Sequence, residues 1–143
     1  MKRIGSSIVI GLVVAGAFVT GCGQPAAAAP KEAAITIEKH ESGPATITLS
    51  AKAAERLGLQ TGEVLGEGAR KTIPYAAVIY DAQGATWAYA ATGALVYQRA
   101  SIAVDRIEGD DAYLTDGPPS GTAVVTLGAA ELYGAETGVG GGH

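Results

Sequence analysis

Residues 75–90 read YAAVIYDAQGATWAYA, and this stretch decides the fold class. Apolar, β-branched and aromatic residues stand on both sides of Asp81-Ala82-Gln83-Gly84, which has the composition of a tight turn. We therefore expect two strands, over residues 75–80 and 86–90, joined as a hairpin. Pro74 has no backbone N–H group, so it belongs at the start or the edge of the first strand.

Short strands and turns that contain Gly or Pro continue on both sides of this hairpin. Ser50 is suited to cap a short helix over 51–57, because its hydroxyl can accept from free backbone N–H groups, and Gly58 is suited to end it. Strands at intervals of about ten residues indicate a mainly β fold, a small barrel or sandwich with one short helix. The other strands are expected at 34–38, 45–49, 59–65, 95–104 (with a bend near Arg99), 112–115 and 122–126, followed by a turn with a short helical cap at 127–132.

One hydrophobic core is expected, because apolar residues recur in the separate predicted strands. Most of seven such residues are expected to meet in it: Val78, Trp87, Tyr89, Val104, Leu114, Val124 and Val125.

The N-terminus has the order of a secretory signal peptide. Lys2 and Arg3 precede an apolar run over residues 8–19, which is shorter than the roughly 20 residues of a membrane-spanning helix. Val19-Thr20-Gly21-Cys22 follows and resembles the lipobox of bacterial lipoproteins, in which the peptidase cuts before a lipid-bearing cysteine. Cys22 is the only cysteine, so it cannot form an internal disulfide, and we expect it to carry the lipid. An ordinary signal peptide with an incidental cysteine is the alternative.

Four parts follow from this organisation. We expect a lipoprotein signal peptide over 1–21 and a flexible tether over 22–33, which contains Pro25 and Pro30. A single β domain is expected over 34–133 and a disordered Gly-rich tail over 134–143.

The charge of the chain limits its partners. Loss of Lys2 and Arg3 with the signal peptide leaves 8 basic and 14 acidic side chains, a formal charge of −6. An acidic chain without a basic stripe is not suited to nucleic acid, nor to a second, polybasic contact with the membrane. The lipid on Cys22 is therefore the expected membrane contact, and the protein is expected to be extracytoplasmic.

The sequence contains no pattern for catalysis, a metal site or a cofactor. His40 lies among charged residues and is expected in a solvated turn, while His143 ends the Gly-rich tail, where metal binding stays open. Four acidic residues could suggest a calcium loop, but they lack the spacing of an EF-hand, and we interpret them as polar turn residues: Glu108, Asp110, Asp111 and Asp116. We predict a protein that is not an enzyme.

Four segments in a fixed order carry a resemblance to a known family. They read ITLSAKAAERLGLQTGEV at 47–64, IPYAAVIYDAQGATWAY at 73–89, YQRASIAV at 97–104 and DGPPSGTAVVTLGA at 116–129. Together they resemble the membrane-proximal β domain of periplasmic adaptor subunits, the HlyD-like membrane fusion proteins of efflux pumps. The chain departs from that family in lacking room for the long α-helical hairpin and in having Pro118 where the family usually has Leu.

The resemblance and the missing catalytic groups together predict a binding function. We expect a lipid-anchored accessory protein that contacts an inner-membrane transporter or a larger adaptor. Two open alternatives are a lipoprotein that binds a small molecule or metal, and a remnant of a split adaptor. The oligomeric state stays open. The first candidates for partner contact lie in the turn 80–84 and the loop 116–121: Tyr80, Asp81, Gln83, Gly84, Asp116, Gly117, Pro118 and Pro119.

Overall fold

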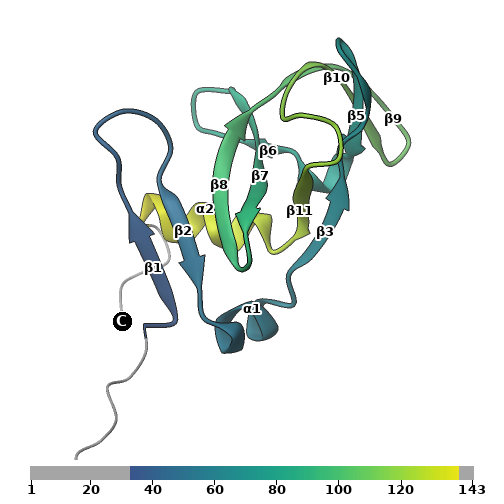
Figure 1. Ribbon diagram of the computed structural model, residues 1–143. Coiled ribbons are helices and arrows are strands. Elements are labelled where there is room, and N and C mark those ends of the chain that lie inside the picture. Colours follow the sequence, from purple (N-terminus) through teal and green to yellow (C-terminus); the bar gives the residue numbers. More distant parts are fainter. Residues whose placement is uncertain (1–32, 139–143) are drawn as a thin grey trace, which may run out of the picture. The chain divides into compact units, whose positions relative to one another are not determined.

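The computed structural model describes residues 33–138, and within them the chain is mainly β, as the sequence predicts. A seven-stranded sheet has the order β1-β2-β8-β7-β11-β3, with β6 paired to β7, and a four-stranded sheet has the order β4-β5-β10-β9 (Figure 1). The strands do not close into a barrel, and the two sheets form a sandwich-like arrangement. The first sheet contains β1 (Ile35–Glu38), β2 (Thr46–Leu49), β3 (Gln60–Glu63), β6 (Ile79–Tyr80), β7 (Thr86–Gly93), β8 (Val96–Ser101) and β11 (Ala123–Leu127). The second contains β4 (Leu65–Glu67), β5 (Arg70–Pro74), β9 (Ala103–Glu108) and β10 (Asp111–Asp116).

Within residues 33–138 the chain passes from one sheet to the other four times, twice at a single buried residue. Val64 separates β3 from β4, and Ile102 separates β8 from β9. Strands that switch sheets at a bend form the corners of such arrangements. The sequence predicts single strands over 59–65 and 95–104, and the bend expected near Arg99 lies at Ile102 instead, where an apolar side chain can turn into the core.

The hairpin at 75–90 is shorter than predicted. Residues Tyr75–Ala77 form a 3-10 turn, η1, and only β6 pairs with β7. The Tyr75 N–H group donates to the Asp110 carbonyl at 2.7 Å, and the Val78 N–H group donates to the Tyr75 carbonyl at 3.0 Å. These hydrogen bonds use backbone groups that a strand over 75–78 would need in order to pair with neighbouring strands.

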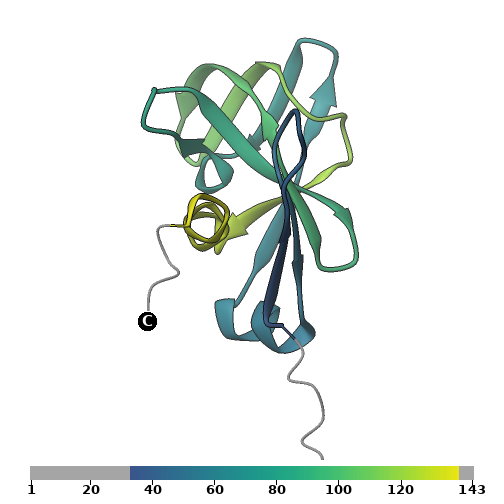
Figure 2. The same ribbon diagram turned by 90° about the vertical axis from the view of Figure 1, so that its left-hand side faces the viewer.

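The described part of the chain contains two α-helices. Helix α1 (Ala51–Leu57) has the predicted caps, since the Ser50 hydroxyl accepts from the Ala53 N–H group and Gly58 has a φ of 59°. Helix α2 (Ala129–Thr137) replaces the predicted short cap and includes residues from Gly134 that the sequence assigns to a disordered tail. It lies along one face of the seven-stranded sheet, as Figure 2 shows nearly end-on.

The apolar side chains form two clusters and not the one core expected. Val124 and Val125 are successive strand residues, so their side chains point to opposite faces of the sheet and enter different clusters. Val78, Leu114 and Val124 belong to the first cluster, with Val104 packed against it, whereas Tyr89 and Val125 belong to the second, under α2. Trp87 is half-buried and belongs to neither, so its predicted core position is wrong.

Several predictions concern residues that the structure does not describe. The signal peptide, Cys22, the tether up to residue 32 and the end of the tail with His143 lie outside 33–138. Among the residues that are described, no helix has the length and apolar character needed to cross a membrane.

Candidate functional site

The turn after β6 is held by one side chain, Asp81. Its Oδ1 accepts from the N–H groups of Gln83 and Ala85, each at 2.9 Å, and its Oδ2 accepts from the Trp87 indole N–H at 2.9 Å. The indole bond is the main reason that the pKa of Asp81 lies below its ordinary value. Gly84 completes the turn with a φ of 81°, which favours glycine.

Two tyrosines at the ends of η1 and β6 are exposed to solvent. The exposed fraction is 50% for Tyr80 and 41% for Tyr75. Partial burial raises the pKa of the Tyr80 phenol, and the neighbouring Tyr75 side chain raises it further. The two phenols therefore lie next to each other at the surface, beside the turn that Asp81 holds.

Behind the turn, Trp87 begins a chain of contacts that leads to α2. The Arg99 guanidinium lies 4.4 Å from the centre of the Trp87 ring and 5.6 Å from that of Tyr133 on α2. Arg99 Nη2 also pairs with Glu136 Oε1 at 3.3 Å. The Glu136 side chain is only 7% exposed and that of Arg99 19%, so water weakens this pair less than it would a surface pair.

Glu136 has a second partner in the sheet. The Tyr89 hydroxyl donates to Glu136 Oε2 at 2.5 Å. Burial and this hydrogen bond raise the pKa of Tyr89 well above its usual range, so the hydroxyl stays protonated and remains a donor. Arg99 Nε is buried and has no partner among the described residues. This network, made of Trp87, Tyr89, Arg99, Tyr133 and Glu136, attaches α2 to β7 and β8.

The second predicted loop, 116–121, is attached to the corner between β3 and β4. The Gly117 carbonyl accepts from Lys71 Nζ at 2.7 Å, and the Ser120 hydroxyl donates to the Gly66 carbonyl. The Gly121 N–H group donates to the Val64 carbonyl at 2.8 Å. The loop therefore joins the two sheets.

The structure separates the predicted contact residues into three groups. Five are exposed, two are half-buried, and Pro118 is buried, so its ring is not available to a partner. Within residues 33–138, no hydrogen bond joins the turn 80–84 to the loop 116–121. The exposed residues are Tyr80, Gln83, Gly84, Asp116 and Pro119, and the half-buried ones are Asp81 and Gly117.

Sequence reasoning missed Tyr75 and the network behind the turn. The sequence predicts a strand at Tyr75, although Pro74 before it is tolerated at the start of a helical turn and was the local sign of η1. Tyr89 and Glu136 are 47 positions apart, and no spacing rule connects residues at that distance.

Possible metal ligands and pockets are the remaining features of the described residues. Within 33–138, no three His, Cys, Asp or Glu side chains lie close enough together to hold a metal ion. A small pocket of about 170 Å³ lies between Lys39, His40 and Glu136, and His40 Nε2 is 2.8 Å from the Thr46 hydroxyl. A larger one, of about 270 Å³, lies on the four-stranded sheet.

Comparison of the chain with protein-family models, curated proteins and solved structures gives no match. The resemblance to periplasmic adaptors therefore stays a prediction from the sequence.

Proposed function

We propose that the chain is a lipid-anchored, extracytoplasmic and non-catalytic domain that docks on a membrane protein, a transporter or a larger adaptor. The docking surface consists of Tyr75, Tyr80 and the turn up to Gly84. Lipid on Cys22 confines the domain to the membrane, so a weak contact suffices there because the effective concentration of the partner is high.

The exposed pair of tyrosines carries this proposal. Aromatic side chains are enriched in protein interfaces and depleted on ordinary surface, because a rigid ring buries much apolar area and loses few rotamers. Tyr80 directly precedes the turn that Asp81 fixes, and Tyr75 opens η1, where its N–H group is bonded to the Asp110 carbonyl. Both supports are already ordered, so little ordering is needed on binding. An exposed pair on a rigid support is typical of a contact surface.

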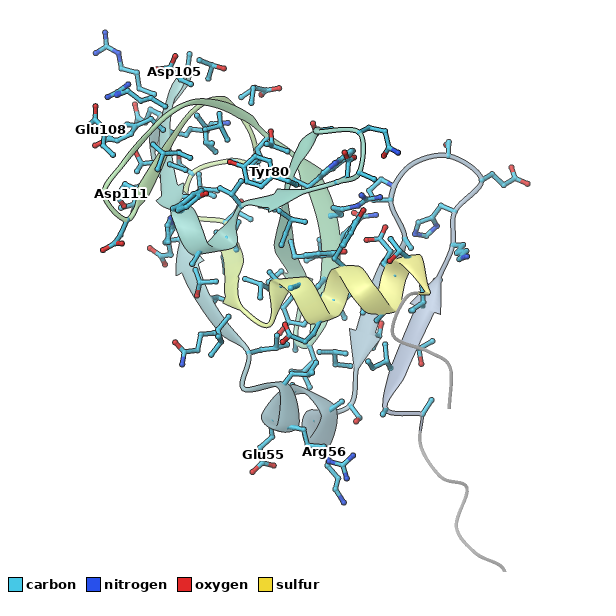
Figure 3. The ribbon with its side chains drawn as sticks, turned by 180° about the vertical axis from the view of Figure 1, so that it is seen from behind. Glu55, Arg56, Tyr80, Asp105, Glu108 and Asp111 are labelled. Atoms are coloured by element: carbon cyan, nitrogen blue, oxygen red, sulfur yellow. The ribbon has the colours of Figure 1, made fainter. Side chains whose placement is uncertain are left out.

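The position of this pair suits a protein held by its N-terminus. Figure 3 shows Glu55 and Arg56 of α1 at one end of the domain and Tyr80 in the half away from them. The Ala34 carbonyl accepts from the Ser50 N–H group, so the chain enters the domain at the α1 end. The twelve residues 22–33, at about 3.3–3.6 Å each, reach roughly 40 Å when extended. Tyr80 thus lies in the half of the domain away from the entry point.

Site-specific photocrosslinking in native membranes tests the proposal. A photoreactive amino acid replaces Tyr80 in one variant and Glu55, exposed on α1, in the control. We expect residue 80 to capture a permease or a hairpin-bearing adaptor, identified by mass spectrometry, and residue 55 to capture none. Equal capture at both positions, or capture at neither, would contradict docking through the tyrosine pair.

A further inference from the structure

We propose a second binding site, for a compact anion, on the four-stranded sheet. The site is a hollow of about 270 Å³. At roughly 30 Å³ for each water, it has room for about nine waters, or one group the size of a monosaccharide. Side chains of β5, β9 and β10 line it and include Arg70, Lys71, Thr72, Arg106, Tyr113 and Thr115.

The charge of this hollow is opposite to that of the chain. Three of the ten basic side chains line it, with Asp105 as the one acidic neighbour, although the whole chain has a net charge of −4. Within residues 33–138, neither Arg70 nor Lys71 forms an ion pair, and Lys71 Nζ has only the neutral Gly117 carbonyl as partner. Arg70 therefore offers an unpaired cation to the hollow, and Lys71, on the other face of β5, adds positive charge behind it, so the site favours an anion.

A β-bulge shapes the opposite side of the hollow. Tyr113 pairs with Arg106 and Leu114 with Val104, so Asp105 is an extra residue in β9. In a regular strand, Asp105 and Arg106 would point to opposite faces, but at the bulge both line the hollow. Bulges that re-aim a side chain in this way are common beside binding sites.

Arg106 is held in place before any ligand binds. Its guanidinium lies 3.9 Å from the centre of the Tyr113 ring. Asp105 and Glu108 accept from it at 3.1 and 2.7 Å. The stacked pair therefore forms a fixed wall, while Arg70 supplies the unpaired charge and the Thr72 hydroxyl, on the same face of β5, supplies a further hydrogen bond.

This arrangement fits a carboxylate or phosphate group on a compact body. An arginine fork binds both oxyanions well, and a flat wall suits a sugar ring or a similar small ring. Tyr80 and the turn 81–84 do not line the hollow, so the site is independent of the proposed docking surface.

Titration of the purified full chain with small anions, followed by NMR, tests this site. The probes are glucuronate and glucose 6-phosphate, with uncharged glucose as the neutral control. We expect saturable shifts of the Tyr113 and Arg70 signals with at least one anion, and weaker binding at higher salt. Arg70→Gln should weaken that binding by about tenfold, because one charge-assisted contact is lost. Lys52→Gln, on α1, should leave it unchanged.

Arg70 is exposed, and its side chain makes no hydrogen bond within the described residues, so Arg70→Gln should keep the melting temperature of the parent chain. Absence of saturable shifts with both anions overturns the proposal. Equal shifts with glucose, or equal affinity in Arg70→Gln and the parent, also overturn it.

Discussion

At the scale of single residues, Glu136 is a charged side chain in a nearly buried position. A nearly buried carboxylate is stable only when its charge and its oxygens are matched, and Glu136 has Arg99 and the Tyr89 hydroxyl as partners. Removal of the carboxylate would leave Arg99 without its ion-pair partner under α2. The side chain therefore joins the C-terminal half of α2 to the sheet.

Glu136→Ala should lower the free energy of unfolding by about 3 kcal/mol. This value is near the low end of the cost of breaking a buried ion pair, because Arg99 keeps some contact with water. Urea unfolding followed by the fluorescence of Trp87, the only tryptophan, measures this. The matched control is Glu131→Ala, an exposed acid in the first turn of the same helix, with a loss of no more than about 1 kcal/mol. Equal losses in the two variants would show that Arg99 finds another partner.

The position of Trp87 could not be predicted correctly from the sequence. Its place in an apolar strand predicts a core position, yet the indole donates to Asp81 and stacks on Arg99 instead. A tryptophan can satisfy an apolar pattern and a polar network equally well, because it has both a large ring and one N–H donor. The Asp81 carboxylate and the Arg99 guanidinium decide between them, and an apolar pattern does not encode such side-chain contacts.

At the scale of elements, the turn 81–84 depends on an ionised carboxylate. The pKa of Asp81 lies below its ordinary value, first because of the Trp87 indole N–H. A carboxyl group with a lowered pKa in the folded state adds stability above its unfolded pKa. This contribution is lost as the pH falls through the folded pKa.

The indole N–H proton of Trp87 should therefore report the protonation of Asp81. In an NMR pH titration, we expect its chemical shift to change with a midpoint below 3.8, the ordinary value. Asp81→Asn should remove this transition, whereas Asp105→Asn, on exposed β9, should keep it. A midpoint at or above 3.8, or a transition that persists in Asp81→Asn, would refute the role assigned to Asp81.

Elements with local signals were predicted well. Helix α1 follows from Ser50 and Gly58, which cap it through neighbours in the sequence. Helix α2 was mostly missed, because it begins after Gly128, ends at Gly138 and contains Gly134, all of which suggest a loop. Its stability comes from Leu132 and Ala129, which are buried in the second cluster, and from Glu136.

At the scale of the whole molecule, the two sheets depend on contacts that no short segment encodes. β2 pairs with β8, about fifty positions away, and single buried residues, Val64 and Ile102, pass the chain between sheets. The alternation of apolar and polar residues predicts that a segment forms a strand, but it does not predict which strands pair with each other. The mainly β class was therefore predictable, while the separation into two clusters was not.

The last prediction concerns the attachment of the molecule to the membrane. Cys22→Ser removes the only thiol, so no thioether-linked lipid can form. The lipid on Cys22 is the proposed anchor, because two lipid chains hold a protein stably at a membrane whereas one chain binds only marginally. We expect the parent chain in the membrane fraction with a lipid-bearing N-terminal cysteine in mass spectrometry, and the variant released from it.

Capture of the permease or adaptor in the photocrosslinking experiment should fall with that release, because the effective concentration of the partner is lost. Lys52→Gln, which leaves the lipid site intact, should stay in the membrane fraction and serves as the control. An unmodified cysteine in the parent, or cleavage at another position, would refute lipid anchoring while leaving the tyrosine surface to be judged by crosslinking. Membrane retention of Cys22→Ser after cleavage would point instead to the protein partner as the main attachment.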